Sequence, residues 1–205
     1  MKNIDTLVFD LGGVLIDWNP TYLYRKIIPD KKEREWFLAN ITTPDWNEEQ
    51  DAGRSLQEAT ELLVRRHPDH EAAIRAYYDR WTEMLGGPIH ETVEIFRELK
   101  TRAQLKLYAL TNWSAETFPV ALDMYEFLHW FDGRLVSGEE KTRKPFPEIY
   151  RLLIERFGIV PTRAIYVDDN ERNVRPAREL GFIGIHFRTP ELFREELVGL
   201  GVLPK

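Results

Sequence analysis

The 205-residue sequence contains no cysteine, no long apolar run and no excess of basic residues. The lack of cysteine excludes disulfides and thiolate metal sites. No run approaches the roughly 18 apolar residues of a membrane span, and no signal-like apolar segment precedes the first strand-like run, so we expect a cytoplasmic protein without a membrane partner. The net charge of -6 argues against a nucleic-acid partner, because phosphate backbones favour a basic face.

The composition, with 43% hydrophobic and 30% charged residues, is typical of a folded globular protein. Helical patterns separate five β-rich runs, which are Thr6–Phe9, Leu105–Leu110, Arg134–Ser137, Ala164–Val167 and Phe182–Phe187. Strands that alternate with helices predict an α/β fold, a Rossmann-like parallel sheet core with helices on both faces.

Residues 17–88 interrupt this alternation and have a nearly all-helical pattern. Ser55 with Glu58 fits a capping box for a helix that runs to His67, and Asp69 can cap the next helix. Gly86-Gly87-Pro88 then predicts a hinge back into the sheet. We therefore predict a core made of residues 1–16 and 89–205, with an inserted all-helical cap over residues 17–88.

Polar residues follow three of the strand-like runs: Asp10, Thr111-Asn112 and Asp168-Asp169. The carboxyl ends of parallel strands meet at one edge of a sheet, so we expect these side chains to gather there. Lys144, immediately before Pro145, adds a cation on a stiff stretch of backbone. Acidic groups, a hydroxyl and a fixed cation are what a magnesium-assisted phosphoryl-transfer site needs.

In chain order these residues read Asp, Thr, Lys, Asp-Asp, and this order resembles the haloacid dehalogenase-like hydrolase superfamily. The segments that carry it are Phe9–Leu15, Leu110–Asn112, Lys144-Pro145 and Val167–Asn170. Most members of that superfamily are phosphatases. The helical insert is similar to the superfamily's cap of the first type, and the Asp-Leu-Gly opening resembles a subgroup with α-D-glucose-1-phosphate phosphatase-like proteins and the N-terminal phosphatase domain of epoxide hydrolases. The resemblance implies a Mg²⁺-dependent phosphatase that acts on a small phosphorylated metabolite, such as a sugar phosphate, through an aspartyl-phosphate.

The resemblance also implies roles for the metal-site residues. Asp10 is the expected nucleophile and a metal ligand, together with the main-chain carbonyl of Gly12. Asp169 is the expected direct carboxylate ligand from the fourth motif. Asp168 is expected either as a second ligand or as one that acts through a water molecule.

Further roles concern the substrate. Thr111 and the amide of Asn112 are expected to hold a phosphate oxygen, and Lys144 to offset the repulsion between Asp10 and an anionic substrate. Trp113, which follows this motif, and Trp18, which follows the first, could line the mouth of the pocket or simply pack in the interior.

Gly12 departs from the family pattern, because most family phosphatases carry a second aspartate there as general acid and base. Losing a proton shuttle ordinarily costs on the order of 10²–10⁴ in rate. We hypothesise that a carboxylate of the acidic turn Trp46–Gly53, namely Glu48, Glu49 or Asp51, takes this role. The alternative is that the turn is a solvated joint between helices.

Two other functions stay open. A metal-independent 2-haloacid dehalogenase would use the same aspartate to attack carbon, but such relatives usually carry a tyrosine at the position of Gly12 and lack the acidic pair. A non-catalytic binding or regulatory protein would keep the fold without the acid, but intact Asp10, Lys144 and Asp168-Asp169 argue against it. The sequence specifies neither the substrate nor the oligomeric state.

Overall fold

The computed structural model describes residues 3–204. At its centre lies a five-stranded sheet with the order β5-β4-β1-β6-β7, in which every neighbouring pair is parallel. The strands are β1 (Thr6–Phe9), β4 (Lys106–Thr111), β5 (Gly133–Val136), β6 (Ala164–Asp168) and β7 (Ile183–His186). Each predicted strand is therefore present, with ends that differ by at most one residue.

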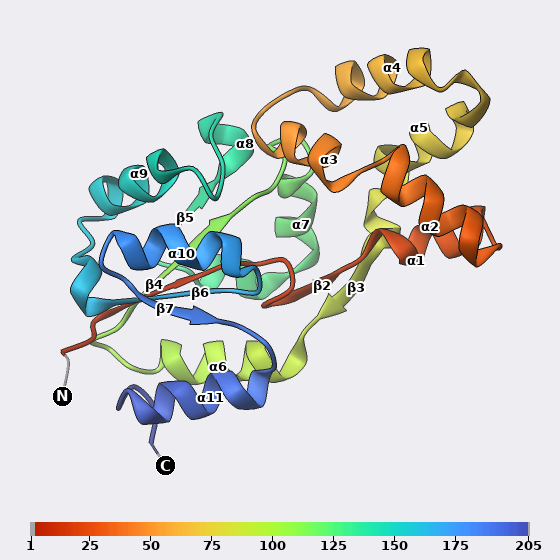
Figure 1. Ribbon diagram of the computed structural model, residues 1–205. Coiled ribbons are helices and arrows are strands. Elements are labelled where there is room, and N and C mark those ends of the chain that lie inside the picture. Colours follow the sequence, from red (N-terminus) through yellow and green to blue (C-terminus); the bar gives the residue numbers. More distant parts are fainter. Residues whose placement is uncertain (1–2, 205) are drawn as a thin grey trace.

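Helices cover both faces of the sheet, as predicted (Figure 1). Buried residues of α6 (His90–Lys100), α7 (Phe118–Met124) and α11 (Pro190–Gly199) pack on one face. Those of α9 (Pro147–Phe157) and α10 (Glu171–Glu179) pack on the other. Side chains alternate between the faces of a strand, so β1 divides its apolar side chains between the two clusters.

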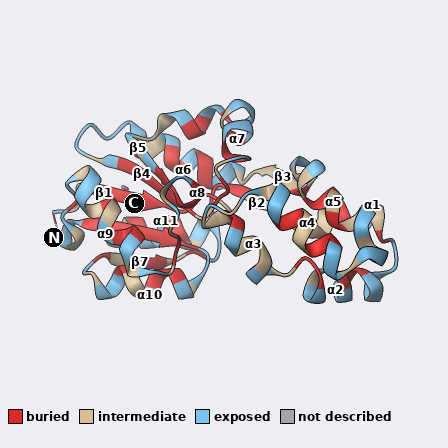
Figure 2. Cartoon of the chain, turned by 90° about the horizontal axis from the view of Figure 1, so that it is seen from above, coloured by how far each residue is buried: buried red, intermediate tan, exposed pale blue. Residues whose placement is uncertain are grey.

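The segment between β1 and α6 forms a separate helical lobe, defined here as Pro20–Met84, which projects from one end of the sheet (Figures 1 and 2). Its elements are α1 (Pro20–Ile27), α2 (Lys31–Asn40), α3 (Pro44–Asp51), α4 (Leu56–Arg66), α5 (Glu71–Asp79) and the 3₁₀ turns Pro68–His70 and Trp81–Met84. The lobe has its own apolar cluster around Tyr24, Phe37 and Ile74, which is why it can fold as a unit beside the sheet.

Two strands connect the lobe to the sheet, so the two ends of the segment 17–88, which we expected to be nearly all helical, are extended instead. β2 (Ile16–Trp18) and β3 (Leu85–Pro88) pair antiparallel, so Gly86-Gly87-Pro88 lies in a strand and not in a free hinge loop. A Gly-rich strand has low β-propensity, and its partner lies about 70 positions away, so local pattern gives no signal for the pairing.

Local capping signals have mixed outcomes. Ser55 caps α4 as predicted, where its hydroxyl accepts from the Glu58 N–H at 3.1 Å. Gly158 ends α9 in the left-handed conformation. Asp69 does not cap α5, because it lies inside a 3₁₀ turn and the helix begins after His70. Among residues 3–204, no helix combines the length and apolar character that crossing a bilayer requires.

The packing of Phe96 provides a test of the core. Its fully buried ring on α6 stacks on Phe131 at 4.4 Å and contacts Phe9 at 5.4 Å between ring centroids. Phe96→Ala should lower the free energy of unfolding by about 3–5 kcal/mol, measured by urea denaturation, because it opens a cavity. Phe146→Ala is the matched control, since that ring is 49% exposed and its loss should cost less than about 1 kcal/mol. Equal losses would contradict this view of the core.

Candidate active site

The Lys144 ammonium lies between two carboxylates at the carboxyl end of the sheet. Its Nζ is 2.8 Å from Oδ2 of Asp10, which follows β1, and 2.7 Å from Oδ2 of Asp168, which ends β6. Lys144 is 1% exposed and Asp168 is fully buried. A charge so buried requires partners, so these ion pairs bring together three of the residues predicted from separate motifs.

Asp168 is fixed by further donors that the sequence analysis did not identify. The Tyr166 hydroxyl donates to its Oδ2 at 2.6 Å, the Asn173 amide donates to both of its oxygens at 3.1 and 3.2 Å, and the Asn170 N–H donates to Oδ1 at 2.9 Å. Burial opposes the ionisation of Asp168, yet Lys144 and these hydrogen bonds hold its pKa below the usual value. Tyr166 could have been recognised, because residues two apart on a strand share a face.

Asp169 supplies a third carboxylate and is the exposed member of the group. Oxygens of Asp10, Asp168 and Asp169 lie within 4.8 Å of one another. A Cβ atom at Gly13 would lie 2.2 Å from Oδ2 of Asp169, and Gly13 has a φ of +72°. Only glycine therefore allows this carboxylate to lie so close to the turn that follows Asp10.

The site carries more negative charge than its lysine can balance. Burial raises the pKa of Asp10 well above its usual value, the charges of Asp168 and Asp169 raise it further, and Lys144 lowers it. Three carboxylates against one ammonium leave an excess of two negative charges. A divalent cation would cancel this excess, and carboxylate oxygens are the donors that Mg²⁺ prefers, so the residues present fit that ion.

Asn112 positions Lys144. Its side-chain Oδ1 accepts from the Lys144 N–H at 2.8 Å, and its Nδ2 donates to the Lys144 carbonyl at 3.0 Å. This pair of bonds holds the backbone of Lys144 beside the end of β4. Thr111, the last residue of β4, is 1% exposed and lies at the same edge of the sheet.

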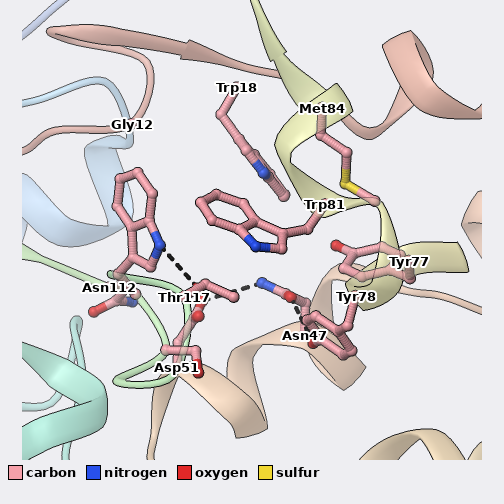
Figure 3. A pocket seen from close by; sticks show the side chains of 12 residues that line it. Gly12, Trp18, Asn47, Asp51, Tyr77, Tyr78, Trp81, Met84, Asn112 and Thr117 are labelled. Carbon is pink, nitrogen blue, oxygen red and sulfur yellow. Dashed lines mark hydrogen bonds between the residues drawn. The ribbon is translucent and has the colours of Figure 1, made fainter. Parts of the chain in front are cut away.

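A pocket of about 100 Å³ opens beside this edge, between the sheet and the helical lobe (Figure 3). From the core it is lined by Gly12, Asn112, Trp113, Ser114 and Thr117; from the lobe and its connecting strands it is lined by Trp18, Asn47, Asp51, Tyr77, Tyr78, Trp81 and Met84. Gly12 and Asn112 place the pocket next to the carboxylates. Half of its other lining residues are aromatic.

Trp113 is a buried wall of this pocket and is 8% exposed. Its indole N–H donates to the Thr117 hydroxyl at 3.1 Å, and its ring meets Trp81 edge to face at 6.1 Å between centroids. The indole can therefore offer its apolar surface to a ligand, because its N–H already has a partner. Trp18, 40% exposed, lies at the opening.

The acidic segment Trp46–Gly53 is not a turn, because α3 continues to Asp51. Thr43 caps this helix and Pro44 occupies its first turn. Glu48 bridges the lobe to the core: its carboxylate lies 2.7 Å from the Arg143 guanidinium and 3.1 Å from that of Arg172. Its charge is thus held by two core arginines at the joint between the two parts.

The sequence matches the family model for haloacid dehalogenase-like hydrolases over residues 4–181. This chain belongs to the haloacid dehalogenase-like hydrolase family. A solved family enzyme from Bacteroides thetaiotaomicron, determined as a magnesium complex, has the same fold, with a TM-score of 0.71 and 23% identity, over 94% of this hydrolase and 100% of that chain.

Named relatives of this hydrolase include two phosphatases. It is 27% identical to a sesquiterpene phosphatase from Aspergillus oryzae, over 87% of each chain. It is 23% identical to a phosphorylated carbohydrates phosphatase from Thermotoga maritima, over 89% of this chain and 84% of that one.

The charge excess predicts that Asp10 destabilises the folded hydrolase when no divalent ion is present. When the pKa of a carboxyl is higher in the folded protein than in the unfolded chain, the group lowers the free energy of unfolding at every pH above its unfolded-state pKa. The reason is that folding then either buries a charge or requires the uptake of a proton. Asp10→Asn should therefore raise the free energy of unfolding by about 1–2 kcal/mol, measured by urea denaturation at pH 7 in EDTA.

Lys144→Met should have the opposite effect and lower the unfolding free energy by about 3–5 kcal/mol, because it leaves Asp10 and Asp168 without their cation. Asp123→Asn, at an exposed position of α7, is the control and should change it by less than about 0.5 kcal/mol. A loss of stability in Asp10→Asn would contradict this account of the charges.

Proposed function

We propose that this hydrolase is a Mg²⁺-dependent phosphatase that removes phosphate from a small metabolite through an aspartyl-phosphate. The observation that carries the proposal is the Asp10 carboxylate, paired with Lys144 at the edge where β1, β4 and β6 end, beside a pocket. The chain passes from β1 to β4 on one side and returns to β6 on the other, so Asp10 lies at a topological switch point of the sheet.

The metal would be held by Asp10, Asp169 and the carbonyl of Gly12. Asp168 would act through a water molecule, since both of its oxygens already accept hydrogen bonds. When bound, the ion would neutralise the charge between the carboxylates and the phosphate and polarise the phosphoryl oxygens. The unmatched negative charge of the site supports this assignment.

The chain's own residues would perform the transfer. The Asp10 carboxylate attacks phosphorus and displaces the alcohol, and water then hydrolyses the aspartyl-phosphate. Lys144, fixed by Asn112, counters the repulsion between Asp10 and the phosphate dianion. The hydroxyl of Thr111 and the main-chain amide of Asn112 orient a phosphoryl oxygen. The helical lobe would act as a cap that closes over the pocket and excludes water.

The phosphatase names of the relatives support this chemistry over the alternatives. A 2-haloacid dehalogenase works without a metal, so its carboxylate substrate would meet three clustered carboxylates with no divalent cation to offset their charge. A binding protein without catalysis would have no use for three carboxylates gathered around one buried lysine.

The lining of the pocket suits a leaving group that has both apolar and polar surface. The indoles of Trp18, Trp81 and Trp113 offer apolar faces, while Asn47 and Asp51 offer hydrogen-bonding groups at one side (Figure 3). A sugar phosphate presents both an apolar ring face and hydroxyls.

Phosphate release from a panel of sugar phosphates, nucleotides and a chromogenic aryl phosphate tests the function. Turnover should require Mg²⁺ and stop in EDTA, and Asp10→Asn should lose roughly 10³-fold or more in kcat. The exposed-site control Asp123→Asn should keep wild-type rates. Metal-independent release of halide from 2-haloacids would show that the protein is a dehalogenase instead. The absence of any turnover would favour a non-catalytic binding protein.

Trp18 provides a test of the pocket as the substrate site. Trp18→Ala should raise KM for the best phosphomonoester about 10-fold with little change in kcat, because it removes apolar contact with the leaving group and leaves the carboxylates intact. Trp36→Ala is the matched control, since Trp36 is 49% exposed and lies elsewhere on the lobe, and it should leave KM unchanged. The same KM in both variants would place the substrate outside this pocket.

A further inference from the structure

The position where a family phosphatase carries its acid is open space in this chain. A Cβ atom at Gly12 would meet nothing within 4 Å, and Gly12 lines the pocket where a leaving group would lie. An alcohol that leaves as an alkoxide requires a proton, so an acid is needed near this space.

Asp51 is the only carboxylic acid among the residues that line the pocket, within the described part of the chain. It lines the pocket from the lobe side, while Gly12 and Asn112 line it from the core side (Figure 3). The two other acids of its helix are placed differently. Glu48 is bound by Arg143 and Arg172, and Glu49 is exposed and does not line the pocket.

The orientation of the Asp51 carboxyl is fixed. The Asn47 Nδ2 donates to its Oδ2 at 3.1 Å, and the Tyr78 hydroxyl donates in turn to the Asn47 Oδ1 at 2.9 Å. Asp51 is the last residue of α3, and Gly53 follows with a φ of +98°. A Cβ atom at Gly53 would lie 3.2 Å from the Gly138 carbonyl of the core, so the lobe is held close to the core at this point.

We propose that Asp51 is the general acid and base of this site, supplied from the lobe in place of the acid that is missing at Gly12. The inference rests on the proposed phosphatase function. In the first step the Asp10 oxygen bonds to phosphorus, the bond from phosphorus to the leaving oxygen breaks, and that oxygen takes the proton of the Asp51 carboxyl. In the second, water gives a proton to the Asp51 carboxylate, its oxygen bonds to phosphorus, and the bond to Asp10 breaks, which restores both carboxyl groups.

The surroundings of Asp51 suit both steps at neutral pH. Burial raises the pKa of Asp51 to about 7, with the Glu48 charge in the same direction and Arg143, Lys144 and the Ser114 amide opposing it. Tyr77 and Tyr78, the other titratable groups of the pocket, have raised pKa values and stay neutral. An acid with a pKa near the working pH can both donate and recover its proton.

The test compares Asp51→Asn with Asp45→Asn, the same change at an exposed position of the same helix. With Mg²⁺ present, kcat/KM of Asp51→Asn for an alkyl phosphomonoester should fall about 10²–10⁴-fold, because the alkoxide then leaves without a proton. For p-nitrophenyl phosphate, whose leaving group needs no proton, kcat/KM should fall less than about 10-fold.

Three further measurements complete this test. Rapid mixing of Asp51→Asn with p-nitrophenyl phosphate should give a burst of nitrophenol of about one equivalent per site, followed by slow turnover. The aspartyl-phosphate should accumulate because no general base assists the water that hydrolyses it. The decline of wild-type kcat/KM for the alkyl ester as pH rises past about 7 should be absent in the variant. Binding of beryllium trifluoride with Mg²⁺ should be unchanged, which shows that the Asp10 site is intact.

Equal losses on both esters without a burst, or wild-type rates on both, would overturn the role of Asp51 and leave the phosphatase intact. A wild-type protein that hydrolyses neither ester would overturn the proposed function itself, and the role of Asp51 with it.

Discussion

The buried ammonium of Lys144, shared by Asp10 and Asp168, is the interaction on which the site depends. It connects the ends of β1 and β6 with the segment before α9, three parts of the chain that are distant in sequence. Lys144 and Asp168 are too deeply buried to carry their charges without partners, so the ends of these segments are held together by charge. The third carboxylate, Asp169, adds negative charge that the single lysine does not balance, and the proposed divalent cation would offset it.

The sheet and the residues at its edge could be predicted from the sequence, because each polar motif directly follows an apolar strand. Asp10, Thr111 and Asp168 are examples, and parallel pairing then brings them together without further information. Lys144 was predicted beside Asp10 from its resemblance to a family motif, whereas its second partner, Asp168, is known only from the structure. The roles of these residues remain predictions until the variants are measured.

Long-range pairings could not be predicted. The ribbon of β2 and β3 joins residues about 70 positions apart, and one of its strands contains Gly86-Gly87, which locally indicates a turn. The Glu48 bridge to Arg143 and Arg172 is of the same kind, since a charged residue on a polar helix gives no sign of its distant partner. The helical character of the segment around Glu48 did have a local signal in Thr43 and Pro44, a cap followed by a first-turn proline.

The β2–β3 ribbon also bears on how such a protein can change over evolutionary time. The chain leaves the sheet and returns to it at paired positions, with Ile16 opposite Pro88, so the two ends of the inserted lobe lie side by side. Joining two neighbouring strand ends costs little loop-closure entropy, whatever the length of chain between them. Replacing this lobe by another helical segment at the same junction would leave the register of the sheet unchanged. Only the pocket walls that the lobe supplies would then differ, while the carboxylates at the edge of the sheet would stay in place.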